Sequence, residues 1–392
     1  MKKKQVKALW YVLLFVFAAL FIVVGYKIAS TDSIMFTGQT GARLNTHIVR
    51  VDLILDKTED KTTFGGELEM VETKIKYSCT VLFGENKGES FIAYQSYDNL
   101  TSRLPTPVRQ GDWIIVYQQE GMGDEYVSGD IVRIRTVILV AAVFFLLLMI
   151  FGKLKGVATV VALGFSVLSI FLVFIPSILA GDNIYVSAIV ICIYTIIITP
   201  FFIGGFNKKS VASALGSIGG VALAGVLSFA LNSFMRITGA VDDETMAVAF
   251  IREPAIDLQA IVFAAMLIGA LGACLDVSMS ISASIYEMKE LSQKDGFGEL
   301  FSSGIKIGWD IMGTQISTLV LAYIGSSLSV VLLLVAYQNS LIEMLNREVV
   351  IIELLQSFIG CFTILFTIPM TAFISAAMFS RNGKHKKKRR IR

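Results

Sequence analysis

The residues best suited to chemistry lie in one stretch, AMLIGALGACLDVSMSISASIYEMKE, at positions 265–290. At 100° per residue, Asp276, Ser280 and Glu287 share one face of a helix, and apolar residues lie across from them. A carboxylate near hydrocarbon is costly unless it faces a bundle interior, a water-filled path or a partner. The stretch therefore predicts a proton- or cation-binding site at Asp276, near the inner end of a membrane helix.

Three further polar residues are candidates for the same site. Asp310 lies where the next apolar stretch begins. It either caps the N-terminus of that helix or meets Asp276 at the same membrane depth. Asn232 and Gln356 are amides inside apolar stretches, where a polar side chain marks a helix contact or a path. With Ser280 and Glu287, these residues complete the predicted transport or ion-binding site.

Small and polar residues recur at helical spacing in three of the apolar stretches. Such stripes let backbones approach closely, because no hydrophobic effect drives helices together in lipid. Each stripe alone indicates a helix contact, whereas the three together with Asp276 indicate a polar-lined interior. The stripes are Ala212, Gly216, Gly220, Ala224, Ser228 and Asn232; Thr314, Thr318, Ala322, Gly325 and Ser329; and Glu353, Gln356, Gly360, Thr363, Thr367 and Thr371.

The usual enzyme and metal motifs are missing from the sequence. The two histidines, His47 and His385, are far apart, and the four cysteines occur singly, so no metal site, disulfide framework or cofactor is expected. GxSxG, HExxH and Walker A patterns do not occur. One enzymatic alternative is an aspartyl dyad, in which Asp276 and Asp310 share a proton. We expect the protein not to be an enzyme.

The composition is that of a multi-pass membrane protein, with 55% hydrophobic residues and a mean hydropathy of +0.70. The net charge of +3 belongs to the tails: the first seven residues hold four Lys, and the last twelve hold eight Lys or Arg. Retention of both ends at an anionic cytoplasmic surface explains these tails better than nucleic-acid binding. The lipid bilayer is the expected partner, with anionic lipids at the C-terminal tail.

Four regions follow from hydropathy. Residues 1–29 form a cytoplasmic tail and a first membrane helix, because the apolar run is long for a cleaved signal peptide and lacks an AxA-like site. Residues 30–135 are polar, 136–380 contain seven more apolar helices with an inner amphipathic segment at 296–309, and 381–392 form a basic tail. The predicted fold is an all-α bundle of about eight transmembrane helices with a β domain between the first two.

The polar region alternates in hydropathy with a period of two, which is typical of strands. Segments 46–55, 67–83, 90–95, 112–118 and 125–135 alternate in this way and are separated by glycines, so they predict a small antiparallel β domain. It follows an outward-going helix and should be extracytoplasmic. The membrane helices are expected near 136–151, 156–178, 184–203, 210–234, 257–276, 311–336 and 351–379.

Charge in the short loops predicts the orientation. Inner loops hold seven lysines, and outer loops hold Arg236, Arg252 and Arg347. By the positive-inside rule, both termini should be cytoplasmic. We therefore expect a multi-pass protein of a bacterial plasma membrane.

Several segments resemble a known family. GALGACLDVSMSISASIYEM, GWDIMGTQISTLVLAYIGSSL, IPMTAFISA and PSILAGDN are similar to YibE/F-like membrane proteins of bacteria, and VLFGENKGESFIAYQSYDN with GDWIIVY resembles the extracytoplasmic part of YibE-type members. Ser317 and Ser329 depart from the family's pattern, which has Asn and Pro there. The resemblance carries over Asp276 and implies no established reaction. It implies, in some bacteria, a neighbouring partner of the same family; a second copy of the chain is the other expected partner.

Two functions fit these observations. The first is a transporter or permease for an unidentified small solute or ion, with a polar intramembrane site near Asp276. The alternative is a non-transporting scaffold or assembly partner that acts through the extracytoplasmic β domain.

Overall fold

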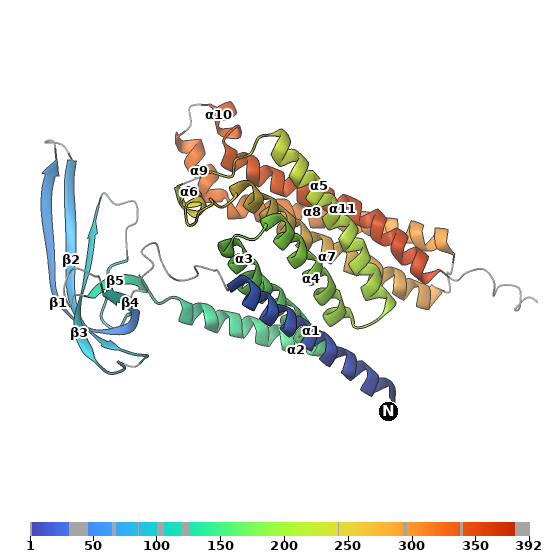
Figure 1. The fold of residues 1–392 in the computed structure, drawn as a ribbon, viewed down its shortest axis with the longest axis horizontal. Helices are drawn as coiled ribbons and strands as arrows, with labels where there is room; N and C mark the ends of the chain where they lie inside the picture. The colour runs from blue at the N-terminus through green and yellow to red at the C-terminus, as the bar shows by residue number, and fades with distance from the viewer. Residues whose placement is uncertain are drawn as a thin grey trace, which may run out of the picture. The chain divides into compact units, whose positions relative to one another are not determined.

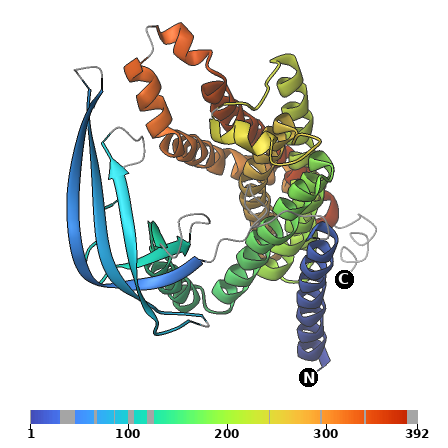
Figure 2. The same cartoon turned by 60° about the vertical axis from the view of Figure 1, so that its left-hand side comes forward.

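The computed structural model describes residues 2–30, 46–64, 68–84, 86–99, 106–118, 126–241, 243–292, 296–337 and 340–380. The chain forms two compact units, Phe36–Leu147 and Met1–Met35 with Leu148–Arg392. The first contains a β-barrel, and the second is a bundle of long apolar helices (Figure 1, Figure 2). The predicted fold class is confirmed in this coarse form. The basic tail at 381–392 lies outside the described residues.

Five strands close the barrel in the order β1-β2-β3-β5-β4. They are β1 (Thr46–Phe64), β2 (Leu68–Val81), β3 (Ser90–Asp98), β4 (Trp113–Gln118) and β5 (Tyr126–Ile131). The predicted antiparallel pairing holds for four of the five strand pairs, whereas β3 and β5 pair in parallel, with Ala93 opposite Tyr126. This strand order is that of the five-stranded Greek-key barrel called the OB fold.

Period-two alternation builds the barrel core. Val51, Ile75, Tyr77 and Val116 point inward and are almost fully buried, while the residues between them face outward. The strand predicted over residues 125–135 ends at Ile131, and helix α2 begins three residues later, at Ile134.

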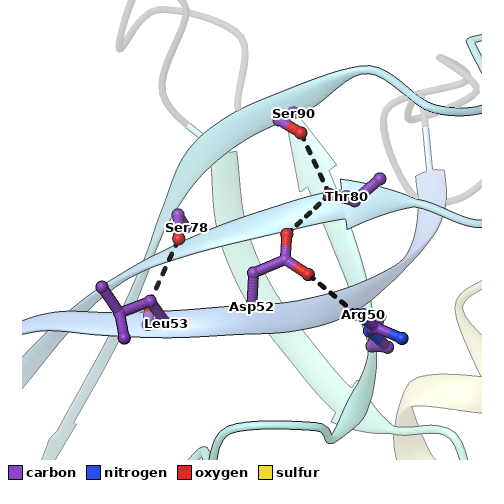
Figure 3. Close-up of polar contacts among 6 residues, drawn as sticks. All are labelled: Arg50, Asp52, Leu53, Ser78, Thr80 and Ser90. Carbon is purple, nitrogen blue, oxygen red and sulfur yellow. Dashed lines mark hydrogen bonds and ion pairs between the residues drawn. The ribbon is translucent and has the colours of Figure 1, made fainter.

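A polar row crosses the outer face of β1, β2 and β3 (Figure 3). Thr80 Oγ1 donates to Asp52 Oδ2 at 2.6 Å and lies 3.0 Å from Ser90 Oγ. Asp52 Oδ1 is also 3.5 Å from Arg50 Nη2. One row further along the strands, Ser78 Oγ donates to the Leu53 carbonyl at 3.4 Å. These contacts tie the three strands together on the side that faces away from the core.

The helices follow in chain order. They are α1 (Lys2–Ser30), α2 (Ile134–Ser169), the π-helical η1 (Ile170–Phe174), α3 (Ile175–Ala180), α4 (Ile184–Gly204), α5 (Lys208–Phe234), α6 (Asp243–Ala249), α7 (Leu258–Ser292), α8 (Phe297–Ser326), α9 (Leu328–Tyr337), α10 (Leu341–Leu345) and α11 (Glu348–Phe379).

The chain folds back inside α2. Lys153 has the non-helical angles φ 51° and ψ −132°, and a Cβ on Gly156 would collide with the Leu148 carbonyl. Residues eight apart in a straight helix are about 12 Å apart along its axis, so this contact requires a turn. The turn falls between the predicted helices 136–151 and 156–178.

Within the described residues, six helices are long and apolar enough to cross a membrane, or seven if α8 and α9 form one bent span. The stretch Ile134–Ala180 counts as one of these, although its 47 residues are enough for two crossings. The eight predicted spans and the positions of the termini stay predictions.

Two helices differ from their predicted bounds. The sixth predicted helix was expected to end at Asp276, but α7 continues to Ser292, so Asp276 lies near its middle. The helix expected from 311 begins at Phe297 and takes in the amphipathic segment 296–309. The apolar face of that segment packs within the chain: Leu300 is fully buried, and Phe297 stacks edge-on against Phe373 of α11 at 5.5 Å.

Candidate functional site

The centre of the helical unit is a seam where α5, α7 and α11 pack along one another. Every member of the α5 stripe from Ala212 to Asn232 is buried, and so are Thr363, Thr367 and Thr371 of α11. The sequence-based prediction that these two stripes make helix contacts is confirmed. The seam is polar, but its hydroxyl groups bond mainly to one another and to backbone.

Hydroxyl and thiol groups link the three helices at mid-seam. Ser278 Oγ of α7 lies 2.9 Å from Ser213 Oγ and 2.6 Å from Ser217 Oγ of α5. Cys274 Sγ, one turn earlier on α7, lies 3.1 Å from Thr367 Oγ1 of α11 and 3.3 Å from the Ser217 carbonyl. Interhelical hydrogen bonds of this kind hold helices together in lipid.

Glycines let the backbones meet at the same level. A Cβ on Gly220 would collide with Thr367 Oγ1 and lie 2.6 Å from Cys274 Sγ. A Cβ on Gly216 would collide with Thr371 Oγ1. Because the close contacts occupy the space that a path would need, the seam is a packed core and not a conduit.

Some seam atoms have no hydrogen-bond partner among the described residues. They are both amide atoms of Asn232 and the hydroxyls of Ser228, Thr371 and Ser375. Asn232 was predicted as a site residue; it is 2% exposed and lies near the C-terminal end of α5. A buried polar group without a hydrogen-bond partner destabilises the folded protein, so the presence of these groups needs a reason.

The α7 side of this seam consists of residues that were not predicted as site residues. Cys274, Ser278 and Ser282 recur every fourth residue, and Ser282 Oγ donates to the Lys209 carbonyl of α5 at 2.8 Å. Their four-residue spacing was the signal that could have found them. These three residues lie on the face of α7 opposite Asp276.

The acid-bearing residues of α7 share one exposed side of the helix, as predicted from the turn of 100° per residue. Asp276, Ser280 and Glu287 are all exposed, while Val277 and Ile281 across the helix are fully buried. The Asp276 carboxylate therefore points away from the seam. It lies in the middle of an apolar helix that is long enough to cross a membrane, where an exposed carboxylate needs water, a cation or a partner.

Both α7 and α8 have a glycine with open space beside it. A Cβ on Gly272 of α7 or on Gly313 of α8 would meet no heavy atom within 4 Å. Two turns before Asp276 on α7, the hydroxyl of Tyr323 of α8 lies against Gly269. Gln356 Nε2 reaches the same region and donates to the Ala265 carbonyl at 3.5 Å.

Asp310 does not have the predicted capping role. It lies well inside α8, whose N-cap is Gly296, and its side chain is exposed. No hydrogen bond joins it to Asp276 among the described residues.

The predicted stripe from Thr314 to Ser329 also differs: its members are exposed, so it makes no packed seam within the described chain. Thr318 Oγ1 instead donates to the Thr314 carbonyl of its own helix at 2.8 Å.

In the described part of the chain, no group of three or more His, Cys, Asp or Glu side chains is arranged to hold a metal ion. The site therefore offers carboxylate, hydroxyl and amide oxygen atoms on α7, α8 and α11. These groups can bind and release a proton or a cation.

A family model described as YibE/F-like protein matches residues 140–381, which include α5, α7, α8 and α11. No curated protein and no solved structure matches the chain.

Proposed function

The chain belongs to the YibE/F-like family, as the match over residues 140–381 shows, and from that premise we propose that it is a permease for a small solute or ion. The observation that carries the proposal is the position of Asp276. It is exposed in the middle of an apolar helix, one turn after the open space at Gly272. A carboxylate at such a depth is costly unless it binds what passes it.

The proposed path runs between α7 and α8. Asp276 takes up a proton or cation, and Ser280 and Glu287 continue the line of oxygen atoms along the same face of α7. Gln356 and Tyr323 form the closure at the opposite end. The sequence has no Walker A motif, so an ion gradient or a separate ATPase supplies the energy.

The proposed moving part is α8 with α9. The two helices are bent by 58° at the break around Ser327, and broken helices are common at transporter sites. The seam of α5, α7 and α11 is the fixed part, because its backbones are in close contact at Gly216 and Gly220. Rocking of α8 against α7 would open Asp276 to each side in turn.

The protein is proposed to lie in a bacterial plasma membrane with both termini inside and the barrel outside. This orientation rests on the basic tails and on the lysines of the inner loops. The basic tail 381–392 would contact anionic lipids, and a relative of the same family or a second copy of the chain would cover the exposed face of α8.

The test is ion flux into proteoliposomes. Proton entry is followed with a trapped pH dye and sodium entry with a radiolabel, for the native protein, Asp276→Asn, Asp276→Glu and Glu299→Gln. Glu299 is an exposed acid in the first turn of α8 and serves as the matched control. We expect Asp276→Asn to lower flux at least tenfold and Glu299→Gln to leave it unchanged. Native-level flux in Asp276→Asn would exclude this site.

A scaffold is the second candidate, favoured by one feature of the barrel. Leu53, Ile54 and Leu55 are consecutive exposed apolar residues on β1. Ile92, also exposed, flanks Ser78, the residue paired with Leu53. By analogy, OB barrels bind ligands on the face of strands two and three. Deleting residues 40–130 distinguishes the two: a scaffold loses crosslinked partners, whereas a permease retains flux.

A further inference from the structure

An apolar groove lies on the outside of the helical unit, away from Asp276. It has a volume of about 630 Å³ and runs between α4, α5 and α7. This volume lies inside the range of about 300–1,000 Å³ that is typical of ligand sites. Its walls are apolar, and they include Ile189, Ile193 and Ile196 of α4, Ala222 and Gly225 of α5, and Leu267 of α7.

Small residues on α5 keep the groove open. A Cβ on Gly225 would lie 3.6 Å from Leu267 Cδ1 and 3.9 Å from Phe263 Cζ, which is ordinary contact. Packing between α5 and α7 therefore does not require a glycine here, unlike at Gly220. The missing side chain adds volume to the groove instead.

The groove adjoins a polar pocket at Tyr185. Tyr185, the second residue of α4, lines the groove and also a pocket of about 200 Å³. Its ring packs on Phe263 with centroids 4.9 Å apart. The polar pocket is also lined by Asp182, Asn183, Arg252 and Asp257. The apolar groove and the charged pocket thus share Tyr185 as a wall.

Arg252 is held in place in this pocket. Its Nη1 donates to the Leu179 carbonyl at 3.4 Å, and its guanidinium lies so close to Gly181 that any Cβ there would collide with it. Gly181 also has φ 87°, a conformation that favours glycine. Asp257 accepts a hydrogen bond from Ala260 N at 3.1 Å at the start of α7.

We propose that this groove and pocket bind one phospholipid with an amine-bearing zwitterionic head group. An acyl chain fills the apolar groove between α4, α5 and α7. The phosphate pairs with Arg252, since a guanidinium suits phosphate geometry, and the ammonium lies by Asp182 and Asp257. One cation and two carboxylates complement a head group that carries both charges better than a purely anionic one.

Native mass spectrometry of the full chain tests this, after purification from nanodiscs that contain equal amounts of phosphatidylethanolamine and phosphatidylglycerol. We expect one retained phosphatidylethanolamine, at least fivefold above phosphatidylglycerol. Gly225→Phe fills the groove and should lower retention at least fivefold, whereas Gly225→Ala should retain it. Arg252→Gln should lower retention of both lipids, because both carry the phosphate, whereas Asp182→Asn combined with Asp257→Asn should abolish the preference for phosphatidylethanolamine.

Leu215→Phe is the matched control, because Leu215 is an exposed residue of α5 that does not line the groove. Thermal unfolding identifies any variant that fails to fold, and Ala222→Phe then replaces Gly225→Phe as a second way to fill the groove. Equal retention in a folded groove-filled variant and in Leu215→Phe would overturn the proposal. So would equal retention of the two lipids by the native chain.

Discussion

Asp276 and Ser278 lie two residues apart on α7 and face opposite sides of it. Ser278 Oγ lies within 2.9 Å of the hydroxyls of both Ser213 and Ser217, while Asp276 is exposed. Two residues of helix turn a side chain by about 200°. This one helix therefore separates a packed polar core from the face that carries the acids, and the two faces respond differently to substitution.

Two glycines, Gly220 of α5 against the packed face of α7 and Gly272 on its exposed face, should differ in their tolerance of a methyl group. Gly220→Ala forces a Cβ against Thr367 and Cys274, and overpacking of this kind costs about 1–3 kcal/mol. Gly272→Ala meets nothing within 4 Å and should be neutral or stabilising by up to about 1 kcal/mol, because alanine favours the helix. Unfolding temperatures in detergent measure both, and an equal effect of the two variants would contradict the packed seam.

Removing the Ser278 hydroxyl should weaken the link between α5 and α7. Interhelical hydrogen bonds in membranes contribute about 0.6 kcal/mol on average, so Ser278→Ala should destabilise the protein by about 1 kcal/mol. A double-mutant cycle with Ser217→Ala measures the coupling. Additive effects of the two substitutions would show that the 2.6 Å contact contributes nothing.

Asn232→Leu should stabilise the protein. Both amide atoms of Asn232 are buried without a partner among the described residues, and an unsatisfied buried polar group costs about 1–3 kcal/mol. Leucine has a similar size and no such cost. We expect the unfolding temperature to rise for Asn232→Leu and to fall for Ser278→Ala. A fall for Asn232→Leu would indicate that the amide binds a ligand or water.

The barrel should lose stability in alkali. Burial raises the pKa of Tyr77 and the pKa of Cys79 to about 12 each, from ordinary values of 10.0 and 9.0. The unfolded chain releases these protons first, so this contribution is complete below about pH 9 and is lost as the pH rises towards 12. The free energy of unfolding then falls by up to about 1.4 kcal/mol per pH unit for each group.

Urea unfolding of the full chain at pH 8 and at pH 10.5 checks this. Tyr77→Phe and Cys79→Val should reduce the difference between the two pH values. Tyr94→Phe, on the outer face of β3 beneath Lys76, is the control and should leave the difference as it is. A native barrel whose stability is the same at both pH values would contradict the burial of these two groups.

Local periodicity predicted much of this molecule. The α5 stripe is buried as its four-residue spacing indicated, and alternation located the strands of the barrel. The faces of α7 were also predicted, since Val277 and Ile281 are buried and Asp276 is exposed. These successes share a cause: the direction of a side chain within one helix or strand follows from geometry alone.

Errors arose where a contact depends on a distant segment. The parallel pairing of β3 with β5 joins strands that are not adjacent in the chain, and alternation carries no information on strand direction. The bounds of α7 and α8 were wrong because both helices extend past their most apolar parts. Asp310 was given a capping role at a helix end that lies instead at Gly296.

By itself, the sequence determined that long apolar helices surround a stripe-bearing core, that a β domain follows the first helix, and that one face of α7 carries acids. Only the tertiary structure decided which stripe is interior: the α5 stripe is buried, while the one beginning at Thr314 is exposed. The physical reason is that lipid and protein interior are both apolar, so hydropathy cannot tell a helix which of its faces meets protein.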